Sequence, residues 1–530
     1  MLILQNLSYQ HPNRDVLFDN LQLTVATHQK LALVGNNGVG KSTLLKIITG
    51  SLSPSGGKVI REASPYFVPQ HFGQYNHLSV AEALQIADKL AALKAILQGQ
   101  VTEEAMTVLD DDWTIEERCQ EALHHWGLDG LDLLQKMGSL SGGQKTKVFL
   151  AGIDIHQPKL VLLDEPSNHL DTAGREKLYR FINQTSCTVM VVSHDRKLLN
   201  LLDTVCELSS RGITVYGGNF DFYASQKKLE MEALHHDVKS KEKDLRKAKE
   251  KSRETLERQQ RLDARGKKKQ EKAGVPTIMM NTLRNRAEKS TSKLKGVHEE
   301  KIDGLFQDLQ TLRKELPDVD KMRLGFDHSS LHKGKILCSA QNINFTFHDQ
   351  LLWSQNLDLE IRSGERIALK GLNGSGKTTL IRLILGELAP PTGTIYRGIG
   401  KSIYIDQDYS LINNHKTVYK QAEGFNTMAL QEHEVKIRLD RFLFTKDDWE
   451  KPCNALSGGE KMRLMLCCLT ISQQAPDLMI LDEPTNNLDI QNIEILTAAI
   501  NDYKGTLVVV SHDDIFLEQV GIERDILLER

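Results

Sequence analysis

The chain has 530 residues, enough for two or three domains that each bury a core. Hydrophobic residues make up 40% and charged residues 26%, a balance that is typical of soluble globular proteins. It contains no apolar run of about 18 residues and no signal-like start, so we expect a cytoplasmic protein without a membrane span. Seven scattered cysteines without a CxxC pair favour reduced thiols over disulfides or a zinc site.

A glycine-rich loop follows the first strongly apolar segment, residues 30–34, and precedes the helical pattern LLKIITG. The order strand, G-x-x-x-x-G-K-S, helix predicts a phosphate-binding loop, because glycines let backbone N–H groups close on phosphate at a helix N-terminus. We expect Lys41 to reach the β- and γ-phosphates and Ser42 to bind Mg²⁺. The ATP-contacting residues predicted here are Gly35, Asn36, Asn37, Gly38, Gly40, Lys41, Ser42 and Thr43.

The stretch 71–139 is 21 residues longer than its counterpart in the second half of the chain, described below. Within it, residues 79–98 predict a helix, since Leu and Ala recur at spacings of three and four. A variable helical subdomain and a partner-contacting arm are equally good interpretations. The acidic run 110–112 argues against RNA contact by this piece.

Two later apolar strands end in polar residues. The segment 160–163 is followed by Asp164 and Glu165, whose carboxylates should point differently because strand side chains alternate. Asp164 suits Mg²⁺, and Glu165 suits polarising an attacking water. His194 follows a Val-rich strand and is expected to contact the γ-phosphate. Its Ser and Asp neighbours do not make a hydrolytic triad, whose members meet in space rather than in sequence.

The middle of the chain is strongly basic. Residues 227–295 contain 22 Lys and Arg against 11 Asp and Glu, a net charge of +11, which leaves −14 for the rest of the chain. A solvated linker is the alternative reading of such a run. Basic residues outnumber acidic ones two to one, and they are densest from Arg258 to Lys272. This excess of positive charge favours an RNA partner. The candidate RNA contacts are Arg258, Arg261, Arg265, Lys267, Lys268, Lys269 and Lys272.

The same segment predicts a helical hairpin. Residues 226–263 contain neither Pro nor Gly and predict one long helix, which Gly266 and the 274–276 step should break. Residues 281–315 predict the return helix, with the tip near 264–283. The tip includes the apolar run 275–280, which we expect to pack against RNA or protein, or alternatively against the linker's own helices.

The motifs recur in the second half in the same order. Lys41 and Lys377 are 336 residues apart, and Asp164 and Asp482 are 318 apart. Two phosphate loops, each followed by the same further motifs, exclude chance. The second copy predicts ATP contacts at Gly371, Asn373, Gly374, Gly376, Lys377, Thr378 and Thr379, Mg²⁺ ligands at Thr378 and Asp482, and catalytic residues at Glu483 and His512.

LSGGQ at 140–144 and LSGGE at 456–460 resemble the ABC signature. The resemblance implies that two cassettes face head to tail, with each ATP between the phosphate loop of one and the signature of the other. Site one would use Lys41 with Ser457 and Gly459, and site two Lys377 with Ser141 and Gly143. Gln70 and Gln407 match the family's glutamine loops, which contact ATP and Mg²⁺. Phe347 matches its adenine-stacking aromatic, where the first copy has His11 with Tyr9 nearby.

More narrowly, the whole chain resembles the ABC-F subfamily, and YGGNFDFY at 216–223 looks like that subfamily's lead-in to its linker. The resemblance implies an α/β fold of two P-loop ABC cassettes, each with a mixed sheet core and a helical subdomain, joined by an α-helical hairpin. The implied domains are 1–222, 223–330 and 331–530. It also implies a monomer with paired cassettes that hydrolyses ATP with Mg²⁺. The implied partner is the ribosome, both rRNA and tRNA, with the linker inserted at the tRNA exit site toward P-site tRNA. Hydrolysis would release the protein. Some members confer antibiotic resistance.

The sequence disfavours three rival functions. A transporter ATPase with separate membrane subunits does not need a long basic rod between its cassettes. A DNA-repair ABC ATPase of the excision type would carry zinc-binding cysteine pairs, and one of the branch-binding type a basic coiled coil at its C-terminus, neither of which this chain has. A scaffold with dead sites is disfavoured because every catalytic position is filled in both copies.

Overall fold

The computed structural model describes residues 1–12, 14–209, 211–272, 296–297, 299–313, 332, 334–347, 350–427, 429–472 and 475–529, without the side chains of 259, 263, 266–272 and 347. The chain divides into two compact units. Met1–Asp221 and Lys321–Arg530 form the first, and Phe222–Asp320 the second.

A mostly parallel sheet forms the core of the first half, in the order β5-β6-β7-β3-β8-β9. Its inner strands are continuous apolar runs, as expected for parallel strands that are buried on both faces. Only β9 runs antiparallel to its neighbour. The strands are β3 (Lys30–Val34), β5 (Pro65–Val68), β6 (Leu160–Asp164), β7 (Thr188–Val192), β8 (Thr204–Ser209) and β9 (Gly212–Tyr216).

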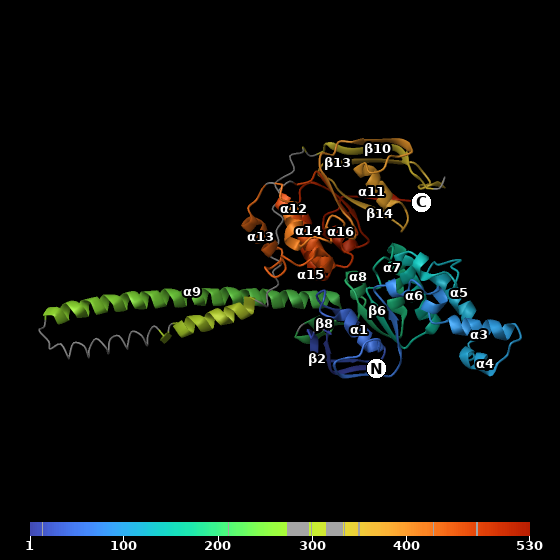
Figure 1. Cartoon of the computed structure of the whole chain (residues 1–530), viewed down its shortest axis with the longest axis horizontal. Helices are drawn as coiled ribbons and strands as arrows, with labels where there is room; N and C mark the ends of the chain where they lie inside the picture. The colour runs from blue at the N-terminus through green and yellow to red at the C-terminus, as the bar shows by residue number, and fades with distance from the viewer. Residues whose placement is uncertain are drawn as a thin grey trace. The chain divides into compact units, whose positions relative to one another are not determined.

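A second, antiparallel sheet packs with α1 (Lys41–Thr49) and the core sheet in one hydrophobic cluster. It has the order β2-β1-β4, with β1 (Leu2–Gln10), β2 (Val16–Val25) and β4 (Gly56–Arg61). The remaining helices of the core are α6 (Gly142–His156), α7 (Thr172–Gln184) and α8 (Arg196–Leu199), labelled in Figure 1.

The helical region of the first cassette differs from the sequence prediction. The prediction of one helix over 79–98 was wrong, because the chain forms two helices there, α2 (Val80–Ala83) and α3 (Ala87–Leu97). Between them Gln85 has a left-handed φ of 58°, which an α-helix cannot contain. The helices α4 (Glu103–Leu109) and α5 (Ile115–His125) follow, and α3 and α4 pack together.

The second half repeats this architecture. Its sheets have the orders β16-β17-β18-β14-β19 and β13-β10-β15, beside a short β11-β12 hairpin. The strands are β10 (Ile336–Asn344), β11 (Thr346–Phe347), β12 (Gln350–Leu351), β13 (Leu357–Arg362), β14 (Arg366–Gly371), β15 (Thr392–Arg397), β16 (Ser402–Ile405), β17 (Leu478–Asp482), β18 (Thr506–Val510) and β19 (Arg524–Leu528). The helices are α11 (Lys377–Leu385), α12 (Val418–Gly424), α13 (Glu432–Arg441), α14 (Gly458–Ser472), α15 (Ile490–Asp502) and α16 (Asp514–Gln519). The two α/β cassettes predicted from the sequence are confirmed.

The helical regions of the two cassettes differ by one pair of helices. The helices α2 and α12 each begin after a hydroxyl side chain that caps the helix, Ser79 and Thr417, and so occupy equivalent places. In the second cassette only residues 425–431 separate α12 from α13, whereas α3 and α4 lie between α2 and α5. The insertion is therefore this helix pair.

The connector begins with α9 (Phe220–Lys272), a single helix of 53 residues. The prediction of one long helix is confirmed, but the predicted break at Gly266 was wrong, since the helix continues through it. A single interior glycine costs about 1 kcal/mol, which a helix of this length can absorb. At 1.5 Å per residue α9 is about 80 Å long. The predicted apolar tip at 275–280 lies outside the described residues.

A return helix is present at residues 299–313 and packs against α9 (Figure 1). Val238 and Leu245 of α9 bury their side chains with Leu309 of the return helix. Two ion pairs flank this contact, Lys241 Nζ to Asp308 Oδ2 at 2.7 Å and Arg313 to Glu242, at 2.6 Å between Nη2 and Oε1. Because residues near 309 lie beside residues near 240, the chain reverses between them, and the hairpin is confirmed.

Two absences hold for the part of the chain that the structure describes. None of its helices is both long and apolar enough to cross a bilayer. All seven cysteines are free thiols, six of them buried.

Replacing Leu309 by Ala should loosen the hairpin, because truncating a buried leucine costs about 2–5 kcal/mol. At the low end this accelerates hydrogen exchange of α9 amides near Val238 and Leu245 by roughly thirtyfold. Leu262→Ala, at a half-exposed α9 position, is the control and should leave exchange near 238–245 unchanged. Equal protection in the Leu309 variant and the parent would contradict the packing role.

Candidate functional site

The first phosphate loop is shaped by glycine and by the helix that it precedes. Gly40 stands at the N-cap of α1 with φ of 103°, and no side chain caps the helix, so its first N–H groups are free for an anion. Lys41 is 7% exposed and donates from Nζ to the carbonyl oxygens of Gly35 at 2.6 Å and Asn36 at 3.2 Å. The lysine is thus held inside the loop, where a phosphate would meet it.

The second loop has the same geometry. Gly376 caps α11 with φ of 90°, and Lys377 Nζ donates to the carbonyls of Gly371 at 2.7 Å and Leu372 at 3.1 Å. One feature is particular to this copy: the buried Trp353 donates from Nε1 to the carbonyl of Ser375, at 2.9 Å. Burial lowers the pKa of both loop lysines, and neighbouring carboxylates oppose this shift.

An aspartate ends the central strand beside each loop, buried in the first cassette and half-buried in the second. Asp164 ends β6 and accepts a hydrogen bond from Ser42, while its Oδ1 has no hydrogen-bond partner among the described residues. Asp482 ends β17 and accepts from the hydroxyl of Tyr404 at 2.9 Å, a contact that Phe67 cannot make at the same register of the first sheet. Burial raises the pKa of both aspartates. A hard cation would offset this desolvation, which fits an Mg²⁺ ligand.

A glutamate follows each aspartate in a strained conformation. Glu165 and Glu483 have left-handed φ values of 51° and 48°, which cost about 1–3 kcal/mol each in non-glycine residues. Each accepts a hydrogen bond from the backbone N–H of a histidine, His194 or His512. The histidine Nε2 lies 3.2 Å from Glu165 Oε1 in the first cassette and 3.4 Å from Glu483 Oε1 in the second.

The electrostatics of these pairs are set by burial. Desolvation raises the pKa of Glu165 and also raises the pKa of Glu483, to about 7. Desolvation lowers the pKa of His194 well below its usual value and that of His512 to about 4. Both imidazoles are therefore neutral near pH 7, so the Glu–His contacts are not ion pairs.

A cavity of about 610 Å³ surrounds Lys41 and is lined by both cassettes. It brings together most of the residues that the sequence assigns to site one. These are His11, Asn37, Gly38, Gly40, Lys41, Ser42, Thr43, Gln70, Asp164, Glu165 and His194 from the first cassette, and Ser457 from the second.

Some predicted residues lie elsewhere. Gln407 was assigned to the second cassette's own Mg²⁺ site, yet it lines the cavity around Lys41. Gly459 does not line it and instead packs on Asn492, which a Cβ there would approach to 2.3 Å. Tyr9 contacts the ring of His11 edge-on and packs into the core, so His11 alone of the two faces the cavity. The side chain of Phe347 lies outside the described residues.

The cavity also contains residues that the sequence reasoning missed. Those from the second cassette are Asp408, Tyr409, Leu456, Gly458, Lys461, Asn486 and Asn487, and those from the first are Leu17, His71 and Val192. The repeat could have pointed to two of these residues. Positions 486 and 487 lie at the same distance from Asp482 as their counterparts in the first copy lie from Asp164. The others depend on the pairing of the cassettes, which no local pattern encodes.

Hydrogen bonds join each phosphate loop to the opposite cassette. Asn37 donates from its backbone N to Asp489 Oδ2 at 2.9 Å and from Nδ2 to the carbonyl of Asn487 at 3.1 Å. Its counterpart Asn373 donates from Nδ2 to the carbonyl of His169 at 3.0 Å. A Cβ added to Gly143 would stand 3.2 Å from the same amide nitrogen, which places the first signature beside the second loop.

The signature serines begin helices. Ser141 accepts from the N–H of Gln144, whose side chain accepts from the N–H of Ser141, and so forms a capping box on α6. Ser457 and Glu460 make the same pair on α14. Since each hydroxyl accepts one bond, its hydrogen remains available to donate to a phosphate oxygen.

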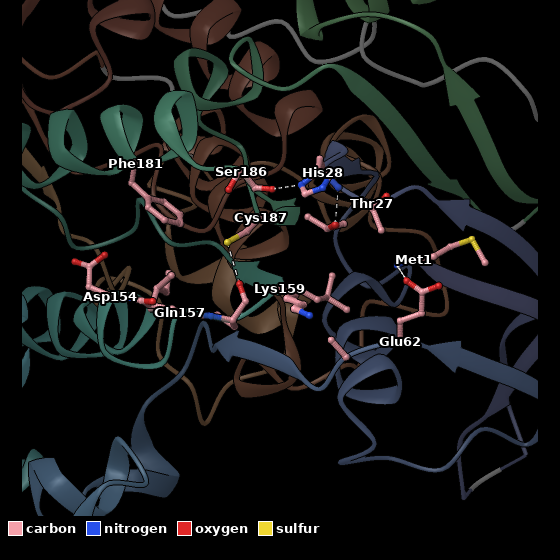
Figure 2. Close-up of a pocket in the computed structure, with 15 residues that line it drawn as sticks. Met1, Thr27, His28, Glu62, Asp154, Gln157, Lys159, Phe181, Ser186 and Cys187 are labelled. Carbon is pink, nitrogen blue, oxygen red and sulfur yellow. Dashed lines mark hydrogen bonds and ion pairs between the residues drawn. The ribbon is translucent and has the colours of Figure 1, made fainter. Parts of the chain in front are cut away.

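A larger cavity, of about 750 Å³, lies in the first cassette (Figure 2). It opens where β3, β6 and β7 begin, whereas the motifs lie where these strands end. Several of its polar groups are paired with one another: the Met1 amino group with Glu62, Cys187 Sγ with a carbonyl, and His28 Nδ1 with the carbonyl of Ser186. This cavity contains none of the predicted site residues.

The basic cluster lies on α9. Arg258, Arg261 and Arg265 are exposed and spaced by three and four residues, so they share one face of the helix. The same spacing continues through positions 268 and 272, whose backbone is helical. The side chains of Lys267, Lys268, Lys269 and Lys272 lie outside the described residues.

Comparisons with known proteins agree with this geometry. The family model described as "ABC transporter" matches residues 18–168 and 354–486. The ATP-binding protein YdiF of Bacillus subtilis is 31% identical over 98% of this chain and 79% of its own length. ABC transporter F family member 5 of Arabidopsis thaliana is 30% identical over 98% of this chain and 73% of its length. ATP-binding protein Uup of Haemophilus influenzae is 30% identical over 96% of this chain and 76% of its own length.

The fold matches solved structures over almost the whole chain. The archaeal ribosome recycling factor aABCE1, in complex with the ribosomal stalk protein aP1, superposes with a TM-score of 0.60 at 20% identity, covering 98% of this chain and 87% of that one. A structure titled "RNase-L Inhibitor" gives the same TM-score and identity, covering 99% and 87%. At this identity the likeness establishes the tandem fold.

Changing Ser457 to Arg should disable the nucleotide site around Lys41, although the two residues are 416 positions apart. The longer side chain would fill the shared cavity and remove the hydroxyl donor. We expect the chain to lose at least half of its steady-state ATP turnover while still binding a fluorescent ATP analogue. Lys504→Arg, an exposed change away from the cavity, is the control. If residues 1–220 alone, verified as monomeric, hydrolysed ATP as fast as the full chain, the shared site would be contradicted.

Proposed function

This chain belongs to the ABC-F family of tandem-cassette ATPases, and from that premise we propose that it acts on the ribosome, which it binds through its basic linker hairpin and leaves after hydrolysing ATP. The observation that carries the proposal is the arginine face of α9 in a chain whose two cassettes are already paired around complete ATPase motifs. The domain limits 1–222, 223–330 and 331–530, a cytoplasmic location and a monomeric state belong to the same proposal.

The residues around each loop suit ATP hydrolysis. Lys41 and Lys377, with the free N–H groups of their helices, would bind the β- and γ-phosphates. The hydroxyls of Ser457 and Ser141 would close each site from the opposite cassette. Glu165 and Glu483 would orient and polarise the attacking water, and His194 and His512, neutral and beside them, would contact the γ-phosphate.

The residues also fit Mg²⁺. The unpartnered Oδ1 of Asp164 and the hydrogen bond from Ser42 place a carboxylate and a hydroxyl together, and both are oxygen ligands that this cation prefers. Gln70 lines the same cavity. Asp482 and Thr378 would act likewise in the second cassette, with Gln407 assigned there by resemblance alone. When bound, Mg²⁺ neutralises the charge that develops on the phosphates.

The linker suits a phosphate-rich partner. Arginines on one helix face provide affinity for nucleic-acid backbone without reading sequence. Members of the family insert this hairpin at the tRNA exit site toward P-site tRNA, and we extend that placement to this chain. The relative named as a ribosome recycling factor supports only the shared fold, because its identity is 20%. A role in antibiotic resistance rests on family resemblance.

Changing Glu165 and Glu483 together to Gln should preserve ATP binding and reduce turnover about 10²–10⁴-fold, because water-positioning carboxylates contribute that much. Phosphate release measures turnover, and equilibrium binding of a fluorescent ATP analogue shows that the loops are intact. The expected product is a closed, ATP-loaded protein. Turnover at the parental rate would remove these glutamates from the mechanism.

Reversing Arg258, Arg261 and Arg265 to Glu should weaken ribosome binding and flatten its salt dependence, since fewer counterions are released. Co-sedimentation with ribosomes across a salt series, in the E165Q/E483Q background, measures both effects. A matched variant with three exposed cassette cations reversed, Lys58, Arg180 and Lys504, carries the same change in net charge. Equal loss in both variants would reduce the linker's role to bulk charge. If neither variant lost ribosome binding and the protein was recovered in a membrane fraction, the transporter function would be favoured.

A further inference from the structure

The catalytic histidine of the second cassette is held by side chains of the first. The hydroxyl of Thr172 lies 3.2 Å from Nδ1 of His512, within hydrogen-bond distance. Arg175 donates from Nη1 to the carbonyl of His512 at 3.4 Å. Both residues lie in the first turn of α7, directly after the loop that contacts the second phosphate loop through His169.

Arg175 is also tied into its own cassette. Its side chain is 11% exposed, its Nε donates to the carbonyl of Leu170 at 3.3 Å, and its Nη1 lies 3.6 Å from Asp195 Oδ2. The same carboxylate accepts from the hydroxyl of Tyr179 at 2.6 Å. Because Asp195 directly follows His194, one guanidinium connects the histidine loops of both ATP sites.

The mirror-related positions cannot do this. The 318-residue offset between the copies maps Thr172 onto Ile490 and Arg175 onto Ile493. Ile493 is 2% exposed, and neither isoleucine has a polar side-chain atom. Accordingly, Nδ1 of His194 is buried and has no hydrogen-bond partner among the described residues, whereas Nδ1 of His512 has Thr172.

We propose that Thr172 and Arg175 are positioning residues that act across the cassette interface on His512, so that the two ATP sites are unequal and hydrolysis at the Lys377 site depends on the first cassette. The inference rests on the catalytic roles proposed above for Glu165, Glu483 and the histidines. It does not depend on the ribosome as partner.

A histidine that contacts a γ-phosphate has to present the correct ring nitrogen in the correct plane. A bond between Thr172 and Nδ1 of His512, in either sense, fixes both the tautomer and the ring rotation. Arg175 anchors the backbone of the same residue, and its charge also opposes the burial-driven rise in the pKa of Glu483. His194 has neither constraint, so its orientation depends on packing and on the bound nucleotide.

Single-site backgrounds test the inference. E165Q leaves only the Lys377 site active, and E483Q leaves only the Lys41 site. R175M and T172V should each lower kcat about tenfold in the E165Q background with KM for ATP within about twofold, because they misplace a catalytic group without removing a binding contact. The loss in the E483Q background should be several times smaller. R175K should restore part of kcat, since Lys donates one hydrogen bond but lacks the fork.

The matched control is I493M, which changes the mirror-related buried position without altering a polar contact. It should not reproduce the preference for one background. Thermal unfolding and binding of an ATP analogue establish that each variant folds; if R175M does not, T172V alone decides. Equal kcat losses in both backgrounds, or an effect confined to KM, would overturn the positioning role. Parental turnover by E165Q/E483Q would instead refute the proposed catalytic roles.

Discussion

The rest of this structure depends on charge that is buried at the carboxyl ends of two central sheets. Each strand end delivers an aspartate and a glutamate opposite a lysine, and these groups are buried in the first cassette and half-buried in the second. Such groups cost several kcal/mol to desolvate unless they are paired. Within the described chain the pairing is incomplete, with unpartnered oxygens on Asp164 and Glu165. A bound nucleotide and cation would provide the missing partners, and this would account for the uncapped helix N-terminus at each loop.

The second constraint is that neither site is complete within one cassette. The bonds from Asn37 to Asp489 and from Asn373 to His169 close the pair from both sides, so each glycine-rich loop also contacts the opposite cassette. The pseudo-symmetry is only approximate. Tyr404 caps one aspartate where the other sheet has Phe67, and Arg175 faces His512 where the mirror position is Ile493. The repeated architecture therefore contains two similar sites whose chemistry need not be equal.

The linker hairpin is stabilised differently from the cassettes. Its helices bury few side chains, chiefly Val238, Leu245 and Leu309, and depend otherwise on ion pairs and intrinsic helix propensity. Because so few side chains are buried, most of the surface of α9 is charged and exposed. The excess of Lys and Arg on this helix agrees with the polyanionic partner proposed above.

The sequence by itself determined the number of cassettes, the strands that carry the motifs, the long basic helix and the motif residues that line the first cavity. These features follow from local patterns, because glycine spacing, apolar runs and helix-favouring composition act over a few residues. It was wrong about the helix at 79–98 and the break at Gly266, where a left-handed Gln85 and the tolerance of a long helix for one glycine decided the outcome. Only the tertiary structure placed Gln407 beside Lys41, added Asn487 and Tyr409 to the site, and brought Arg175 to His512. Those contacts join positions hundreds of residues apart, and their geometry is set by how two surfaces pack, which no periodicity along the chain records.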